Sequence, residues 1–253
     1  MDCYIMDRKT YSRDIYSKYW ITARESNSFS KGLLEYEKNM CDYISKQISK
    51  GGKLLDVAIG TGYPFGYFLQ RAGYWVNGID IAPILIEKCQ ELFPNINCHV
   101  GDAEDLEYPD NYFDCVYCFN ATFYFTNLNK ALDEMLRVTK EEGLVIFDIK
   151  NSKNKAVAQN YKKSLSQNKG IGRIARYVKN IVKIFLPNET PLWDWNVPIH
   201  EVPTDPKTVK DYLENKNIDN YQIMAKKGDG TLEKKYSNSS FEEYERLVFS
   251  IRK

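Results

Sequence analysis

Residues 53–62 read KLLDVAIGTG, an apolar run followed at once by a glycine-rich turn. The run is typical of a buried β-strand, and the residues after the turn have the apolar spacing of a helix that ends near Gly73. A glycine-rich turn between a strand and a helix lets the backbone approach a ligand closely and points helix amides at it. The stretch therefore predicts the first strand of an α/β fold and a site for a nucleotide-like ligand.

Outward from this stretch, short apolar runs alternate with helical patterns, an order typical of a parallel sheet. We expect a Rossmann-like α/β fold with a seven-stranded, mostly parallel sheet, helices on both faces, an N-terminal helical cap and a helical insertion after the fifth strand. The predicted strands are 53–58, 74–80, 96–102, 113–119, 143–149, 221–226 and 246–251. A single domain over 1–253 would divide into a cap (1–50), a core (51–150), a basic lid (151–205) and a C-terminal helix with strands (206–253).

The charges of the 253 residues are nearly balanced but unevenly placed. A net charge of +1 argues against a protein that binds polyanions over its whole surface. Residues 151–186, however, hold nine Lys and Arg and no Asp or Glu, which leaves 26 cations against 34 anions elsewhere. Such a segment favours an anionic substrate, although a solvated helix face or a helix resting on an anionic membrane would have the same composition.

The chain begins MDCYIMDRKTYSRD, which has no apolar core for a signal peptide, and no run reaches the roughly 18 apolar residues of a membrane-spanning helix. We therefore expect a cytoplasmic protein without stable membrane insertion. Cys115 and Cys118 have the spacing of a zinc or redox pair, but they lie in an apolar strand-like run. Burial as small apolar residues is the preferred interpretation, and no metal site is predicted.

Three acidic residues come at or near the ends of the first three predicted strands: Asp56, Asp80 and Asp102. Asp80 lies twenty residues beyond Gly60, where several nucleotide-binding folds place an acceptor for two ribose hydroxyls. The dinucleotide fingerprint fails because its third glycine would fall at Phe65, and there is no Walker lysine. Three converging carboxylates suit a cationic ligand with an amine, a ribose and an adenine amino group, and S-adenosylmethionine has all three.

The stretches LLDVAIGTG, GIDIAP, GDAEDLEYPDNYFDCVYCFNATFYF and KALDEMLRVTKEEGLVIFDI occur in this order between Lys53 and Ile149. In sequence and spacing they resemble the class I S-adenosylmethionine-dependent methyltransferases. The resemblance implies that Asp56, Ala58, Gly60 and Gly62 hold the methionine part of this cofactor, Asp80 the ribose, Ile81, Asp102 and Ala103 the adenine, and Asn120 the methionine amine. The family's first loop glycine is replaced here by Ala58.

The resemblance also places candidates around the reacting atoms. Tyr124 lies where related enzymes carry residues near the transferred methyl, so its hydroxyl is a candidate to orient a nucleophile; a place in the pocket wall is the alternative. His200 follows an aromatic, proline-rich segment on the expected substrate side and is the candidate general base, with Glu201 and Asp148 as alternatives. Tyr19 and Arg24 of the N-terminal segment are candidates for the methionine end; packing roles would explain both equally well.

The sequence thus predicts methyl transfer to an O or N of a small anionic metabolite, phosphorylated or nucleotide-linked, in surface-polysaccharide or natural-product biosynthesis. A nicotinamide-dependent oxidoreductase, or a degenerate methyltransferase scaffold that only binds a partner, are the alternatives. Nucleic acid is not expected as a partner, because the Asn-Pro-Pro-aromatic and Pro-Cys signatures of nucleic-acid methyltransferases are absent. The sequence does not predict an oligomeric state.

Overall fold

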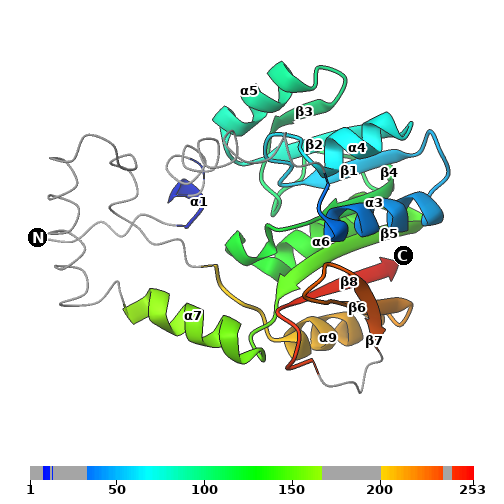
Figure 1. The fold of residues 1–253 in the computed structure, drawn as a ribbon. Coiled ribbons are helices and arrows are strands. Elements are labelled where there is room, and N and C mark those ends of the chain that lie inside the picture. The colour runs from blue at the N-terminus through cyan, green and yellow to red at the C-terminus, as the bar shows by residue number, and fades with distance from the viewer. Residues whose placement is uncertain (1–7, 12, 14–32, 167–200, 236–240) are drawn as a thin grey trace, which may run out of the picture.

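The computed structural model describes residues 8–11, 13, 33–166, 201–235 and 241–253 (Figure 1). These residues build an eight-stranded sheet with the order β3-β2-β1-β4-β5-β8-β6-β7. The strands are β1 (Lys53–Val57), β2 (Trp75–Asp80), β3 (Asn97–Val100), β4 (Phe113–Cys118), β5 (Thr139–Lys150), β6 (Tyr221–Lys226), β7 (Leu232–Lys235) and β8 (Arg246–Arg252). The helices are α1 (Arg8–Tyr11), α3 (Glu35–Gln47), α4 (Phe65–Arg71), α5 (Pro83–Leu92), α6 (Leu128–Val138), α7 (Lys155–Ser166) and α9 (Pro206–Asn215), with a 3-10 turn η2 at Thr122–Tyr124.

Strands β1 to β5 run parallel, as the alternation of apolar runs and helices predicts. The order changes direction between β1 and β4, because β2 and β3 extend the sheet on one side of β1 and β4 and β5 on the other. Open α/β sheets bind ligands at such a point, outside the carboxyl ends of the strands. The topology therefore places a crevice at the carboxyl end of β1, directly before the glycine-rich turn.

The other half of the sheet is antiparallel. Strand β8 pairs with both β5 and β6, and β6 pairs with β7. The sequence predicts seven strands, and β7 is the additional one. Its sequence, LEKK, has a single apolar residue and no alternation, so its pairing with β6 rather than its own pattern makes it a strand.

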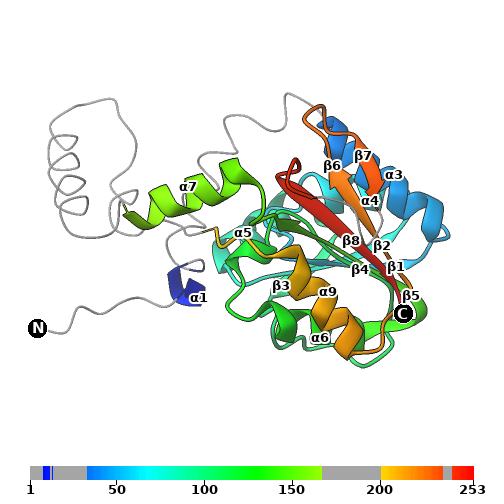
Figure 2. The ribbon, with the colours of Figure 1, turned by 90° about the horizontal axis from the view of Figure 1, so that it is seen from below.

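Helices cover both faces of the sheet, which confirms the predicted Rossmann-like architecture (Figure 2). Helices α3, α4 and α5 pack on one face around a cluster that includes Met40, Leu69 and Cys89. Helices α6 and α9 pack on the opposite face with Leu132 and Leu213. The two layers fix the strand ends rigidly, so that the loops after them can hold side chains in defined positions.

Cys115 and Cys118 lie three residues apart on β4 and therefore face opposite layers of the core. Both are buried, and burial raises the pKa of both thiols. The interpretation of this pair as apolar core residues is confirmed. In the described residues, no group of three or more His, Cys, Asp and Glu side chains could hold a metal ion.

The basic segment 151–186 begins with α7, so its helical spacing is confirmed over Lys155–Ser166. Residues 167–200, which carry the rest of its cations, lie outside the described residues. Among the helices that are described, none has the length and apolar character needed to cross a membrane.

Candidate active site

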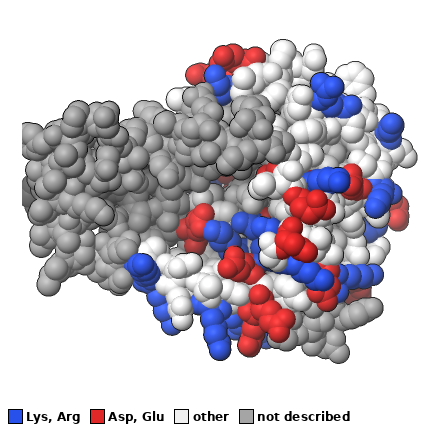
Figure 3. All heavy atoms as spheres, viewed as in Figure 1, with Lys and Arg blue, Asp and Glu red and all other residues white. Residues whose placement is uncertain are grey.

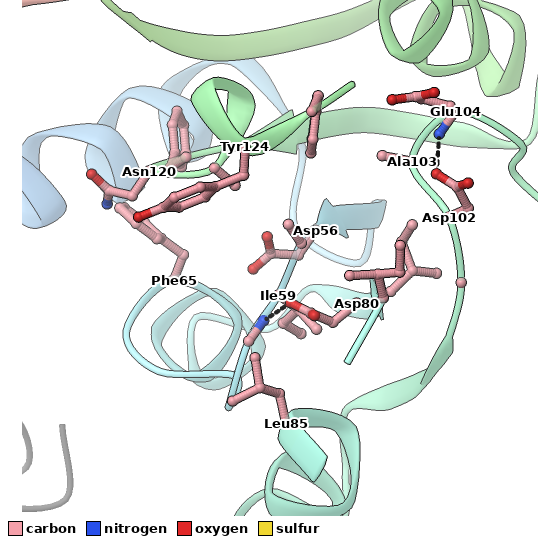
Figure 4. A pocket seen from close by; sticks show the side chains of 18 of the residues that line it. Asp56, Ile59, Phe65, Asp80, Leu85, Asp102, Ala103, Glu104, Asn120 and Tyr124 are labelled. Carbon is pink, nitrogen blue, oxygen red and sulfur yellow. Dashed lines mark hydrogen bonds between the residues drawn. The ribbon is translucent and has the colours of Figure 1, made fainter. Parts of the chain in front are cut away.

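A pocket lies at the carboxyl ends of β1, β2 and β4, and we refer to it as the inner pocket (Figure 4). It encloses about 1050 Å³ of empty space, including the part open to solvent. That is room for a nucleoside-sized ligand, since binding pockets for small molecules typically measure about 300–1,000 Å³. Most of the predicted cofactor residues line it: Asp56, Ala58, Gly60, Asp80, Ile81, Asp102, Ala103 and Asn120.

The glycine-rich turn forms one wall of the inner pocket. Ala58 and Gly60 both have left-handed backbones, with φ of 65° and 59°. This conformation is easy for glycine and strained for alanine, which accounts for the glycine that related enzymes carry at the position of Ala58. Gly62 does not line the pocket: a Cβ there would lie 2.7 Å from Cys89 Sγ, so its glycine lets the turn pack against α5.

Asp80 and Asp56 bring buried carboxylates to the centre of the pocket (Figure 4). Asp80 Oδ2 accepts a hydrogen bond of 2.9 Å from Gly60 N, and Oδ1 accepts one from Ala82 N. Burial raises the pKa of Asp80 to about 6 although these amides act in the opposite direction. Burial also raises the pKa of Asp56 well above its ordinary range. Desolvated carboxylates of this kind are stabilised by a positively charged ligand.

Asp102 and Glu104 form one end of the inner pocket. Asp102 Oδ1 accepts a hydrogen bond from Glu104 N, and Asp102 Oδ2 lies 2.6 Å from Lys9 Nζ. Lys9, from helix α1, also lies 2.9 Å from Glu104 Oε2. Burial lowers the pKa of Lys9, but these two acids outweigh it and the net pKa is raised. The N-terminal segment thus contacts the end of the pocket that the resemblance assigns to adenine.

Asn120 and Tyr124 form the opposite end (Figure 4). Asn120 has a φ of 61°, and its amide donates a 2.9 Å hydrogen bond to Asp148 Oδ1. Asp148 is fully buried, and its Oδ2 accepts hydrogen bonds from Tyr36 Oη at 2.9 Å and Arg246 Nη1 at 2.6 Å. With both oxygens engaged inside the protein, Asp148 holds the Asn120 turn in place instead of facing a substrate.

A second hollow, the outer pocket, adjoins this end and shares Asn120 and Tyr124 with the inner one. The start of α3 and residues from β6, η2 and β8 form its walls. Tyr124 Oη donates a 3.0 Å hydrogen bond to Glu201, which also pairs with Lys150. Burial and the nearby guanidinium of Arg246 lower the pKa of Lys150 to about 8. The charged residues of the outer pocket are Glu35, Glu37, Glu201, Asp229, Lys226 and Arg246.

Comparison with known proteins agrees with this geometry. Residues 55–147 match a family model described as a methyltransferase domain. Residues 55–147 carry a methyltransferase domain. Its fold resembles that of an S-adenosylmethionine-dependent methyltransferase from Thermotoga maritima at 14% identity and a TM-score of 0.59, covering 93% of this chain and 100% of that one. The cofactor that this family and fold imply is S-adenosylmethionine.

Two curated relatives align with part of the chain. A sterol 24-C-methyltransferase from Gibberella zeae is 32% identical over 124 residues, 46% of this chain and 32% of the relative. A malonyl-[acyl-carrier protein] O-methyltransferase from Halorhodospira halophila is 33% identical over 99 residues, 38% of this chain and 34% of the relative. The chain thus spans about a third of the length of each relative.

Not every candidate residue lies in the part of the chain that the structure describes. Tyr19, Arg24 and His200 lie outside the described residues, so their roles stay predictions. Sequence reasoning missed Lys9, Glu104 and Arg246. Glu104 is two residues beyond Asp102 and could have been suspected from that spacing, whereas neither of the two cations carries any motif.

Proposed function

We propose that this protein transfers a methyl group from S-adenosylmethionine to an oxygen or nitrogen of a small anionic metabolite. The observation that carries the proposal is the meeting of Asp56, Asp80 and Asp102 in one pocket beside the glycine-rich turn. Two of these carboxylates are buried and have raised pKa values, so the pocket favours a cationic ligand. The match of residues 55–147 to a methyltransferase domain supports the same conclusion.

The donor set of the inner pocket fits S-adenosylmethionine along its whole length. Asp80 would accept the ribose hydroxyls, and Asp102 with the Ala103 amide would bind the polar edge of adenine. Ile81 and Leu85 offer an apolar surface for the ring, and both line the pocket. At the other end, Asp56 and the carbonyl of Asn120 would hold the methionine amine. Gly60 contributes by its left-handed backbone, which brings its amide within 2.9 Å of Asp80.

The chain's own residues orient the acceptor and exclude water. When bound, S-adenosylmethionine supplies a methyl group on a positively charged sulfur, which becomes a neutral thioether as the acceptor atom takes the methyl. Tyr124 lies where the two pockets meet, and its hydroxyl would align the acceptor in line with the methyl. The buried rings of Phe65 and Phe119, 4.7 Å apart, line the inner pocket and exclude water from it.

A base is required only for an acceptor that is protonated at working pH, such as a hydroxyl. We propose His200 for this role, and Glu201 is the neighbouring candidate because it accepts a hydrogen bond from Tyr124. Proton loss from the acceptor to this base, or to water, balances the transfer. If His200→Ala leaves turnover intact from pH 6 to 9, this part of the proposal is wrong.

The anionic character of the metabolite is supported by the nine cations of residues 151–186. A phosphorylated or nucleotide-linked compound of surface-polysaccharide or natural-product biosynthesis is the substrate that this segment suggests. We further propose a cytoplasmic protein that does not act on nucleic acid. On the face seen in Figure 3, Lys and Arg are interspersed with Asp and Glu over the described surface, in keeping with a small substrate.

Each of the two alternative functions is tested by its own measurement. Calorimetric titration of the full chain with S-adenosylhomocysteine and with NAD should give binding of the first alone. NAD binding without S-adenosylhomocysteine binding would overturn the proposal in favour of an oxidoreductase. For a degenerate scaffold, no metabolite pool should yield product labelled from radioactive S-adenosylmethionine, although the cofactor binds.

A further inference from the structure

Arg246 is the least expected residue of the outer pocket. It is the first residue of β8, and its side chain is only 15% exposed. One nitrogen, Nη1, donates to Asp148 Oδ2 at 2.6 Å. Within the described part of the chain, Nε and Nη2 make no hydrogen bond, and neither nitrogen is sealed in the core. Because a buried guanidinium is costly unless its donors are used, these nitrogens are available for a ligand.

The surroundings of Arg246 hold its guanidinium in place. Its Cζ lies 5.4 Å from the centre of the Phe123 ring, and Lys150 Nζ lies 4.7 Å from the same centre. Asp148, which anchors Nη1, is itself fixed by Tyr36 and by the backbone amide of Asn120. A guanidinium held by a ring and by one hydrogen bond loses little entropy when it binds a ligand through its remaining donors.

Arg246 also has the right location for contact with an acceptor. It lines the outer pocket, which meets the inner pocket at Asn120 and Tyr124. It lines a third hollow as well, which shares Glu201 and Lys226 with the outer pocket. A small molecule held at Arg246 therefore lies beside the end of the inner pocket that we assign to the methionine part of the cofactor.

The charges of the outer pocket limit the kind of anion that fits. Four acidic residues and two basic ones line it, so its net charge is negative apart from the region around Arg246 and Lys226. Lys226 is a second cation, with Nζ 5.2 Å from the centre of the Tyr36 ring. A planar, singly charged carboxylate matches the two free donors of a guanidinium, whereas a phosphate monoester would bring a second negative charge against the acidic wall.

We infer that Arg246 binds a carboxylate of the methyl acceptor in the outer pocket, so that the substrate is a small carboxylic acid without a phosphate group. This inference rests on the proposed function: it keeps the anionic methyl acceptor but replaces the phosphorylated or nucleotide-linked compound suggested by the basic segment with a carboxylic acid. According to this inference, residues of β8 and the start of α3 select the methyl acceptor, and the basic segment 151–186 does not.

The test uses three fluorinated probes of similar size: 4-fluorobenzoate, 4-fluorophenyl phosphate and 4-fluorobenzamide. Their binding to the full chain is measured by fluorine NMR in the presence of saturating S-adenosylhomocysteine. We expect 4-fluorobenzoate to bind at least tenfold more tightly than the other two. Arg246→Met should weaken its binding at least tenfold while S-adenosylhomocysteine affinity changes less than threefold.

Two further variants make this result specific. Arg246→Lys keeps a charge beside Asp148 but loses the paired donors, and we expect it to weaken 4-fluorobenzoate binding at least fivefold even if Arg246→Met does not fold. Arg252→Met is the matched control, since Arg252 ends the same strand, is partly exposed and donates to Glu142 O. It should bind the probe as the unmodified protein does.

The inference is overturned if no probe binds, if the phosphate or the amide binds as tightly as the carboxylate, or if Arg246→Lys leaves binding unchanged. It is also overturned if Arg252→Met weakens binding as much as Arg246→Lys. Failure of the proposed function has a different signature, because the unmodified protein would then not bind S-adenosylhomocysteine in the first place.

Discussion

The inner and outer pockets meet at Asn120 and Tyr124 but are built in different ways. Loops after β1, β2 and β3 and the turn after β4 form most of the inner pocket, so its residues occur in a fixed order within residues 55–147. The outer pocket combines the start of α3, residues of β6 and β8, and Glu201, which lie far apart in the chain. Most residues of the inner pocket therefore lie within the matched methyltransferase domain, whereas most residues of the outer pocket lie outside it.

Removal of the buried carboxylate that hydrogen-bonds both Asn120 and Arg246 should have the largest effect on stability. Asp148→Ala leaves the guanidinium of Arg246 without its buried partner, and breaking a buried ion pair in this way costs about 3 kcal/mol or more. Denaturant unfolding measures the loss. The control is Asp211→Ala, whose solvent-exposed ion pair with Lys207 should contribute little to stability. Equal losses for the two variants would show that the buried Asp148–Arg246 pair contributes no more to stability than an exposed one.

A substitution confined to the inner pocket should change cofactor affinity without changing binding in the outer pocket. Asp80→Ala removes the proposed acceptor for the ribose hydroxyls and the anchor of the Gly60 amide, so we expect the affinity for S-adenosylhomocysteine to fall well over tenfold. Calorimetry measures it, with Asp114→Ala as the control, because Asp114 lies at the opposite end of the sheet and pairs with Lys140. Unchanged affinity in Asp80→Ala would contradict the ribose role.

The pH dependence of binding should separate the two carboxylates of the inner pocket. Asp80 has a pKa of about 6, so it is ionised above pH 7 and becomes protonated as the pH falls through 6. Protonation removes an acceptor, and the affinity for S-adenosylhomocysteine should fall below pH 6, by up to about tenfold per pH unit. In Asp80→Asn this dependence should disappear. If it persists in that variant, the titrating group is Asp56, whose pKa is also raised.

The smallest effect is expected in the glycine-rich turn. Ala58 adopts a φ of 65°, a conformation that costs an alanine about 1–2 kcal/mol. Glycine would avoid this cost, but the greater conformational freedom of glycine in the unfolded chain would offset part of the stabilisation. Ala58→Gly should therefore raise the free energy of unfolding by about 1 kcal/mol or less, as thermal unfolding would report. Ala72→Gly, at a φ of −74°, should instead lower it. Destabilisation by both substitutions would argue against strain at Ala58.

The inner pocket could be predicted because each strand carries its own signal. An apolar run followed by Asp80 or by the glycine-rich turn identifies a strand end, and parallel topology brings those ends to one edge. Ala58, Asp80 and Asn120 accordingly line the inner pocket. Gly62 does not, because no local pattern shows that its backbone faces α5.

The positions of the first five strands along the chain, their parallel direction, their helices and the acidic strand ends were determined by the sequence itself, through apolar periodicity and short-range spacing. Only the tertiary structure decided that LEKK joins the sheet as β7, that Lys9 reaches Asp102, and that Arg246 stands beside Asn120 and Tyr124. These outcomes depend on contacts between residues far apart in the chain. Such contacts form because the packed layers bring the residues together, and no local pattern records them.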